Sequence, residues 1–284
     1  MKSDNWLYEI KPKGKFIDLN LKEIWRYRDL LILFVKRDIV TVYKQTVLGP
    51  LWFLIQPLFT GVIFTLVFNK LGGINTYGVP SFLFNLSGIT LWSYFKESLS
   101  TTSKTFLTNS SLFGKVYFPR VIAPASKVIS GLLKYIIQLG IFFVFYLFFL
   151  WNGEDLQLGP YWYLLPIPVF SVAILGLGVG MILSSLTTKY RDLSILIDFG
   201  IQLLMYISAV MYSLQFASEQ LGEYAWLVTY NPLAQLIELY RNMLLNVGQD
   251  SLWQLLIAVV ISIATLFIGL VIFNRTEKTF IDTV

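Results

Sequence analysis

The chain has 284 residues, of which 56% are hydrophobic and 17% aromatic but only 14% charged, and its formal net charge is +5. Soluble domains carry roughly 25% charged residues, so this composition and the long apolar runs indicate an integral membrane protein. Cysteine and histidine are absent, which excludes disulfides, thiol chemistry, the Ser-His-Asp triad and the usual zinc sites, and we expect no catalytic residue and no metal site.

The N-terminal segment mixes basic and apolar residues. Residues 22–44 carry Lys and Arg among Ile, Trp, Leu, Phe and Val, and the apolar run at 30–35 is too short for a membrane span, which needs about 20 residues. This mixture predicts an amphipathic helix on the membrane surface, with its apolar side in the lipid and its cationic side toward headgroups or a partner. We assign 1–47 to a cytoplasmic N-terminal segment and 48–284 to a transmembrane domain.

The remainder of the chain predicts an all-α membrane domain. Its second apolar segment carries several polar residues between aromatic ones and is poorly suited to face lipid. Gly176, Gly178 and Gly180 in the fourth segment contain a GxxxG spacing, which predicts close helix packing. Six segments can each cross the bilayer as a helix, namely 51–68, 82–100, 130–151, 161–186, 193–213 and 252–273.

The distribution of basic residues predicts the orientation. With the N-terminus inside, only Lys70 and Arg241 of the 22 Lys and Arg fall on the outer side, while Lys134 lies within a span. The positive-inside rule therefore places both termini in the cytoplasm. Two connections are then long, an inner one at 101–129 and an outer one at 214–251, and long connections in compact proteins usually have a function.

The outer connection has a helical pattern. After Asn231-Pro232, apolar residues recur at helical spacing, and Glu238 and Arg241 can pair on a more polar side. The segment is too polar for two further spans, so we expect short re-entrant helices that dip into the outer leaflet. They would form either a simple cap on the bundle or an external gate.

A nucleotide-binding loop is absent from the sequence. Gly73 and Gly78 have the P-loop spacing, but a Val-Pro pair follows where Lys-Ser/Thr is required. The energy for active transport would therefore come from a partner or from an ion gradient. Lys134 and Asp198 lie within spans and could form an ion relay. Because both lie near the cytoplasmic ends of their spans, we favour snorkelling for Lys134 and a bundle-facing position for Asp198.

Polar side chains recur along three spans. Such stripes either join helices or line a hydrated path, and both interpretations stay open. Aromatic and polar groups together suit sugars, whose C–H faces stack on rings while their hydroxyls form hydrogen bonds, although aromatic residues are also common at membrane interfaces. The stripes comprise Asn85, Ser87, Thr90 and Ser93 in the second span, Asp198, Gln202, Tyr206 and Ser213 in the fifth, and Trp52, Gln56 and Thr60 in the first.

Four motifs in chain order, on six spans with this orientation, resemble the membrane subunit (permease) of ABC exporters for bacterial cell-surface polysaccharides. This group includes exporters of O-antigen, teichoic acid and capsule. The length and the N-terminal extension are most similar to O-antigen exporters of Gram-negative bacteria. The motifs are LGPLWFLIQPLF at 48–59, LFGKVYFPRVIAPASKVISGL at 112–132, KYRDL at 189–193 and NPLAQLIELYRNML at 231–244.

The resemblance implies a homodimer that joins two cytoplasmic P-loop ATPase subunits in the bacterial inner membrane and moves a lipid-linked polysaccharide. ATP and Mg²⁺ would be bound by the ATPase, so this chain would hold no cofactor, and it would contact membrane lipids but no nucleic acid. A short coupling helix within 105–120 would dock on the ATPase. We assign this contact to Phe106, Leu112, Phe113, Lys115, Tyr117, Phe118 and Arg120.

The resemblance also implies a path at the dimer interface, lined by spans one, two and five. ATP-driven closure of the partners would shift the two halves apart, and the glycan would pass out reducing end first through gate helices within 215–250. The implied path residues are Trp52, Gln56, Asn85, Trp92, Tyr94, Gln202, Tyr206 and Tyr212, and the implied gate residues are Tyr224, Trp226, Tyr230 and Arg241.

The basic N-terminal helix would lie where the substrate enters. Its cations would bind either the pyrophosphate of the lipid-linked glycan or only anionic lipid headgroups. Gly49-Pro50 is the candidate joint that passes movement from this helix into the first span. The implied pyrophosphate ligands are Arg26, Arg28, Lys36 and Arg37.

Other functions remain as alternatives. ABC permeases for teichoic acid, capsule, lipids or drugs share the expected fold. A membrane transferase acting on polyprenyl-linked sugar would need buried acid–base residues, and the chain offers neither histidine nor a central carboxylate pair. A passive channel would leave the long inner connection without a purpose.

Overall fold

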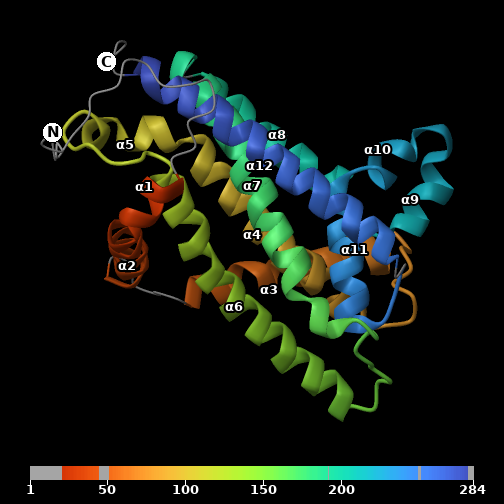
Figure 1. Cartoon of the computed structure of the whole chain (residues 1–284). Helices are drawn as coiled ribbons and strands as arrows, with labels where there is room; N and C mark the ends of the chain where they lie inside the picture. The colour runs from red at the N-terminus through yellow and green to blue at the C-terminus, as the bar shows by residue number, and fades with distance from the viewer. Residues whose placement is uncertain (1–20, 45–50, 191, 249–250, 281–284) are drawn as a thin grey trace, which may run out of the picture.

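The computed structural model describes residues 21–44, 51–190, 192–248 and 251–280, and within these ranges it contains helices and loops but no strand. The predicted all-α fold is thereby confirmed. The expected joint at Gly49-Pro50 and the expected boundary between 47 and 48 lie outside the described residues. The elements in Figure 1 are α1 (Leu21–Arg26), α2 (Arg28–Lys44), α3 (Trp52–Phe64), the π-helix η2 (Thr65–Leu71), α4 (Ser81–Ser103), α5 (Thr105–Phe113), α6 (Ile122–Trp151), η3 (Trp162–Leu164), α7 (Pro166–Lys189), α8 (Leu193–Ile207), α9 (Leu214–Leu221), η4 (Gly222–Tyr224), α10 (Trp226–Thr229), α11 (Pro232–Leu245) and α12 (Leu252–Phe280).

Helix α4 forms the centre of the bundle. It packs against α3, α6, α7, α8 and α11, and its polar residues Asn85, Ser87 and Thr90 are fully buried. The hydroxyls of Ser87 and Thr90 donate to carbonyl oxygens one turn earlier in the same helix, at 2.7 and 2.8 Å. Because neighbouring helices cover α4, its polar side chains avoid lipid, which explains how this sequence can form a central helix.

Four described helices are long and apolar enough to cross a membrane: Trp52–Leu71, Ile122–Trp151, Trp162–Lys189 and Leu252–Glu277. The chain is therefore a multi-pass membrane protein. Helix α4 has the length of a span but too many polar residues, and α8 is apolar but has only 15 residues. The spanning role of these two helices and the cytoplasmic position of both termini stay predictions.

Small residues bring α7 close to two neighbours. A methyl group added to Gly178 would lie 2.7 Å from the backbone nitrogen of Leu266 in α12, and one added to Gly176 would lie 2.9 Å from Cβ of Ser98 in α4. These distances are below van der Waals contact, so glycine permits the approach of the helix backbones. The close packing predicted from the GxxxG spacing is confirmed.

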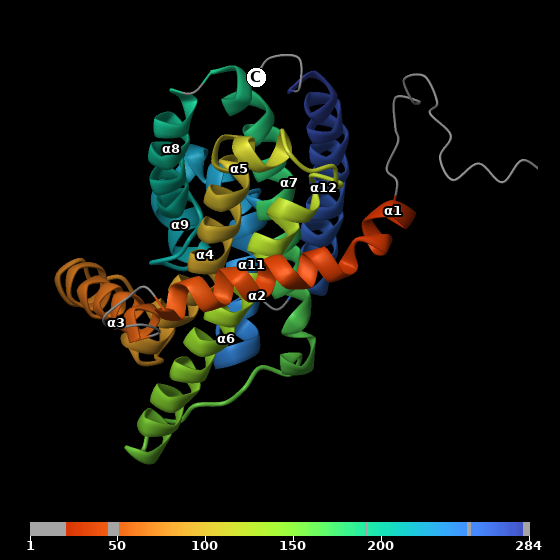
Figure 2. The same cartoon turned by 90° about the vertical axis from the view of Figure 1, so that its left-hand side faces the viewer.

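The expected amphipathic helix is divided at Tyr27 into α1 and α2. Figure 2 shows that α2 lies across the bundle, and it packs against α6. On its protein side the buried Phe34 ring meets Phe118 edge-on at 5.8 Å. On the opposite side Trp25, Ile32 and Leu33 are exposed, and a helix on the membrane surface would bury such residues in lipid.

Candidate functional site

The inner connection is held to the bundle by an aromatic cluster. Phe106 and Phe113 of α5 are buried, and so is Phe118 in the loop that follows. Phe106 stacks on Phe273 of α12 at 4.6 Å, and Phe113 contacts Phe118 at 5.7 Å. Since Phe118 also contacts Phe34, one cluster joins the inner connection to both α2 and α12.

Arg120 adds a polar anchor to this cluster. It is 5% exposed, its Nη1 donates to the carbonyl oxygen of Glu277 at 2.8 Å, and its Nε lies 3.8 Å from the Glu277 carboxylate. Its guanidinium also lies over the ring of Phe113, 5.3 Å from the centroid. Burial lowers the pKa of Arg120, and the negative charge of Glu277 opposes that shift.

The residues predicted for ATPase coupling therefore separate into two groups. Phe106, Phe113, Phe118 and Arg120 are buried and support the loop rather than presenting a surface. Lys115 and Tyr117 are exposed, Leu112 is half-buried, and all three could meet a partner. Val116 is exposed too and was missed, although its position between Lys115 and Tyr117 could have indicated it. Contact with an ATPase stays a prediction.

The basic residues of α1 and α2 lie mainly outward. Arg26, Arg28 and Lys36 are exposed, and the Arg28 guanidinium lies 5.7 Å from the centroid of the Trp25 ring. Arg37 is engaged by the protein, because its Nη2 lies 2.9 Å from Oδ1 of Asp38 and its guanidinium lies over the Phe34 ring. All four predicted pyrophosphate ligands are thus exposed, one of them in an ion pair, and their role stays a prediction.

The predicted path residues also divide by burial. Asn85 is fully buried and its Nδ2 donates to Asn69 Oδ1 at 2.7 Å and to Thr65 Oγ1 at 3.1 Å, so it joins α4 to η2. Tyr94 is buried and donates to the carbonyl oxygen of Val128 at 3.2 Å. In this conformation Asn85 and Tyr94 join helices, whereas the buried Trp92 packs on Phe95 of its own helix. Their place in a path stays a prediction.

The remaining path residues lie on the surface of one copy. Trp52 and Gln56 are exposed on α3, and Gln202 and Tyr206 are exposed on α8. Tyr212 is half-buried, and its hydroxyl donates to the carbonyl oxygen of Tyr206. The place of these residues in a path also stays a prediction.

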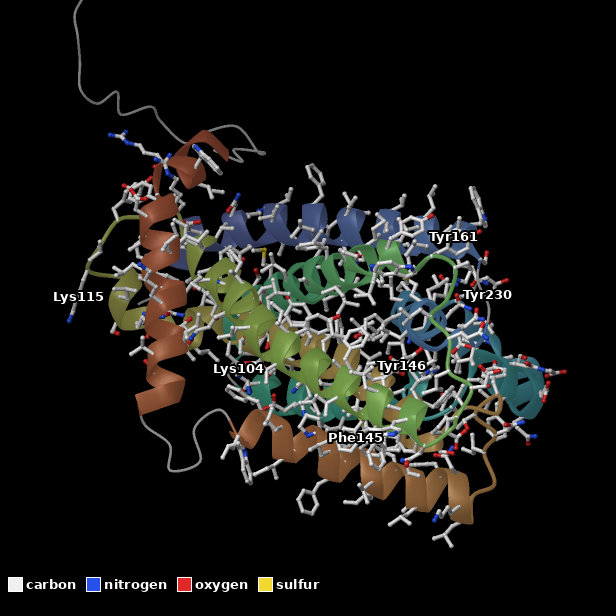
Figure 3. The ribbon with its side chains drawn as sticks, turned by 90° about the horizontal axis from the view of Figure 1, so that it is seen from below. Lys104, Lys115, Phe145, Tyr146, Tyr161 and Tyr230 are labelled. Carbon is white, nitrogen blue, oxygen red and sulfur yellow. The ribbon has the colours of Figure 1, made fainter. Side chains whose placement is uncertain are left out.

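Three predicted gate residues lie at the far end of the molecule. Figure 3 shows Tyr230 at the end opposite to Lys115 and the inner connection. Tyr224, Trp226 and Tyr230 are all exposed. Arg241 differs from them, because its side chain is 0% exposed within α11.

Arg241 pairs with Glu238, as predicted from their spacing, at 3.1 Å between Nη1 and Oε2. The expectation that this pair lies on a polar side is wrong, because nearly every residue of α11 is buried beneath α4, α7 and α12. The guanidinium also donates to the carbonyl oxygens of Val210 at 3.0 Å and Ala209 at 3.3 Å. Buried carbonyl groups of a loop need such donors, because they have no partner in a helix.

This contact lies directly after the end of α8. The span predicted at 193–213 ends as a helix at Ile207, and Ala209 adopts a positive φ of 51°. The carbonyl groups of Ala209 and Val210 in this loop accept from Arg241, whose guanidinium also lies 3.8 Å from the centroid of the Phe84 ring. Sequence reasoning missed Gly88, where a methyl group would lie 2.6 Å from the carbonyl oxygen of Val210 and 2.7 Å from Arg241 Nη2.

The two charges expected within spans both have partners. The Lys134 ammonium contacts the Glu97 carboxylate and lies 4.7 Å from the centroid of the Phe53 ring. Asp198 is exposed and accepts from Lys104 Nζ at 2.8 and 2.9 Å. Each charge is therefore neutralised by an ion pair, which removes the need for a relay to explain it.

The chain is similar to known transport proteins over most of its length. The family model of the ABC-2 type transporter matches residues 29–245. An O-antigen export system permease protein RfbA from Klebsiella pneumoniae is 28% identical over 256 residues, which cover 89% of this chain and 94% of the relative. An RfbA protein from Myxococcus xanthus is 23% identical over 93% of this chain and 98% of the relative. A polysialic acid transport protein KpsM from Escherichia coli is 23% identical over 87% of this chain and 93% of the relative.

The apolar spans and the match to a transporter family identify the chain as the membrane subunit of a transporter. The family match covers well over half of the sequence. The chain belongs to the ABC-2 type transporter family, in which it is a permease subunit.

Proposed function

We propose that this chain is the membrane subunit of an ATP-driven exporter that moves lipid-linked, O-antigen-type polysaccharide across the bacterial inner membrane. The observation that carries the proposal is its similarity, along nearly the whole chain, to three proteins named O-antigen export system permease. The similarity to KpsM favours capsular polysaccharide as a second candidate substrate.

The inner connection supports the assignment of an ATPase partner. Lys115, Val116 and Tyr117 form an exposed tip, while the buried aromatic cluster behind them joins the connection to α2 and α12. A partner that binds the tip could therefore move two other elements with it. In the proposed complex two ATPase subunits bind ATP and Mg²⁺, and this chain supplies the docking surface.

Two apolar faces support a homodimer. Phe59 and Ile63 of α3 are exposed, and so are Ile195 and Phe199 of α8. Exposed apolar residues can face lipid or a second copy, and a transport path needs walls on both sides. We place the path between two copies, where Trp52 and Tyr206 supply aromatic rings and Gln56 and Gln202 supply amides for sugar hydroxyls.

Two features of the outer end support a gate there: exposed aromatic side chains on short helices, and a buried arginine that holds the segment before them. Tyr224, Trp226 and Tyr230 are exposed on and beside short helices that span only part of a bilayer. Arg241 ties the segment before α9 to α11, and so fixes where the gate begins. We propose that the exposed aromatics meet the emerging glycan while Arg241 positions the segment that carries them.

A gene deletion tests the proposal directly. Loss of surface polysaccharide, with lipid-linked glycan accumulating inside the cell and recovery on complementation, is the expected result. Affinity purification of the permease should also recover a P-loop ATPase. Altered drug sensitivity with intact surface polysaccharide would contradict the proposed substrate.

A further inference from the structure

An apolar groove runs between α8 and its neighbours α4 and α7. Its volume is about 330 Å³, and every residue that lines it is either apolar or a glycine. Two walls have residues at helical spacing, namely Leu183 and Leu186 on α7 and Ile197, Gly200 and Leu204 on α8. Figure 2 shows α8 at the edge of the bundle, so one wall of the groove is a peripheral helix.

Helix α8 is held to the bundle by polar contacts near both of its ends. Asp198 accepts from Lys104 Nζ at 2.8 and 2.9 Å, and the carbonyl oxygen of Ile207 accepts from Asn231 Nδ2 at 3.2 Å. Within α8, all of which the structure describes, Ile201 is the one buried residue. The packing of α8 against the bundle is therefore incomplete, and the groove lies where further apolar contacts would form.

The depth of the groove determines what can fill it. The span that contains α7 ends at Lys189, one turn beyond Leu186, so the groove lies at the level of the hydrocarbon layer. A bound water needs about two to four polar partners, and the apolar lining supplies none. The exposed rim residues Leu186 and Leu196 make the groove continuous with the lipid-facing surface. Hydrocarbon from the membrane can therefore enter it from the side.

The length of the groove selects an acyl chain. From Leu193 to Leu204, α8 rises about 16 Å at about 1.5 Å per residue, which is close to half of the roughly 30 Å hydrocarbon core. One acyl chain of a phospholipid spans one leaflet, whereas the polyprenyl chain of a glycan carrier extends well beyond it. Lys189 is exposed at the end of α7 and places an ammonium group where a lipid phosphate would lie.

We infer that the groove holds one acyl chain of a membrane phospholipid, with the phosphate of this lipid toward Lys189. The chain supports α8 on the side opposite to Ile195 and Phe199, the face on which a second copy is proposed to lie. The inference uses the membrane position of the protein and is independent of the transported substrate.

The test uses the full chain in vesicles of phosphatidylethanolamine and phosphatidylglycerol. A small fraction of the phosphatidylglycerol carries a diazirine midway along one palmitoyl chain, and irradiation attaches it to the residues that it contacts. Peptide mass spectrometry then locates the label. The wild type should be labelled at Leu183, which is half-buried in the α7 wall. Phe267 of α12 is exposed to lipid and serves as the internal reference.

A series of larger side chains at Gly200 locates the bound chain. A methyl group added to Gly200 meets no atom within 4 Å, so larger side chains have room to fill the groove. Relative to Phe267, labelling of Leu183 should fall about tenfold or more in Gly200→Phe, because several methylene groups of the lipid lose their burial. Gly200→Leu should act in the same direction, and it keeps the test decisive if Gly200→Phe does not fold.

Gly140→Phe is the matched control. Gly140 is also an exposed helical glycine whose added methyl group meets no atom within 4 Å, but it lies on α6 and outside the groove. Labelling of Leu183 in this variant should equal that of the wild type.

Four outcomes contradict the inference. Label on Phe267 but not on Leu183 in the wild type would show that acyl chains stay outside the groove. Labelling of Leu183 that is unchanged in both Gly200 variants would show that the lipid reaches it by another route. Loss of this label on addition of a little polyprenyl phosphate would assign the groove to the glycan carrier. The chain has no cysteine, so rapid disulfide cross-linking between two copies of Gly200→Cys would assign the groove to a second copy.

Discussion

The two ends of the bundle each bury an arginine, but the surroundings of the two differ. Arg120 at the inner end lies among aromatic rings and bonds to one carbonyl group and one carboxylate of α12. Arg241 at the outer end bonds to carbonyl groups of the loop that follows α8 and to Glu238. The inner end is therefore held mainly by apolar packing and the outer end by a polar network, so the two should respond differently to substitution.

The largest loss of stability is expected on substitution of Arg241 in the polar network at the outer end. Arg241→Met leaves the Glu238 carboxylate buried without its charge partner and removes the donor to the carbonyl groups of Ala209 and Val210, which should cost about 3–5 kcal/mol. The measurement is the thermal stability of the purified protein followed by gel filtration. Arg275→Met, at an exposed arginine of α12, is the matched control and should change stability by less than about 0.5 kcal/mol.

A double variant sharpens this prediction. Glu238→Gln combined with Arg241→Met removes the unpaired charge as well as the guanidinium, so part of the lost stability should return. A double variant that is as unstable as the sum of the two single ones would show that the pair is not coupled.

Truncation of a ring in the aromatic cluster at the inner end should cause a somewhat smaller loss of stability. Phe106→Ala removes a ring that is 1% exposed and stacked on Phe273, which should cost about 3 kcal/mol, the lower end of the range for such truncations. Limited proteolysis of the inner connection is the measurement, because the loss should first expose residues 105–121. Unchanged cleavage there would contradict the supporting role of the ring.

A methyl group added where α4 contacts Val210 and Arg241 should cause an intermediate loss of stability. Gly88→Ala places Cβ against the carbonyl oxygen of Val210 and the Arg241 guanidinium, so overpacking should cost about 1–3 kcal/mol. Gly140→Ala is the control, because a methyl group there meets no atom within 4 Å. Equal melting temperatures for the two variants would refute the close contact.

The smallest change in stability is expected at the exposed tip. Lys115→Glu should leave the melting temperature within the equivalent of about 0.5 kcal/mol, because Lys115 is exposed. It should nevertheless lower co-purification of the ATPase and export of polysaccharide, since the tip is the proposed docking surface. Lys70→Glu, at an exposed residue between α3 and α4, should change neither property.

The sequence predicted helices and close packing because both have local causes. Apolar length predicted the four strongest spans, and the spacing of Gly176 and Gly180 predicted a close approach that the backbone distances confirm. The pairing of Glu238 with Arg241 followed from their separation on a helix. Such features depend on residues near one another in the chain.

The sequence alone did not predict which residues are buried or which residues far apart in the chain contact one another. An aromatic residue such as Phe113 can either present a surface or fill a core, and only the position of α12 and α2 decides between them. The buried loop after α8 is bound by a guanidinium that comes from α11, more than thirty positions later. The ion pair of Asp38 in α2 likewise depends on Lys127, which α6 contributes.

Transport by reconstituted protein tests the central claim most directly. The permease and its co-purified ATPase would be placed in vesicles with a labelled lipid-linked glycan, and the label that becomes accessible to a glycan-degrading enzyme on the opposite side would be followed. We expect movement that requires ATP and falls with Lys115→Glu. Glycan movement that is equal with and without ATP, or ATP-dependent movement of a drug but not of the glycan, would contradict the account.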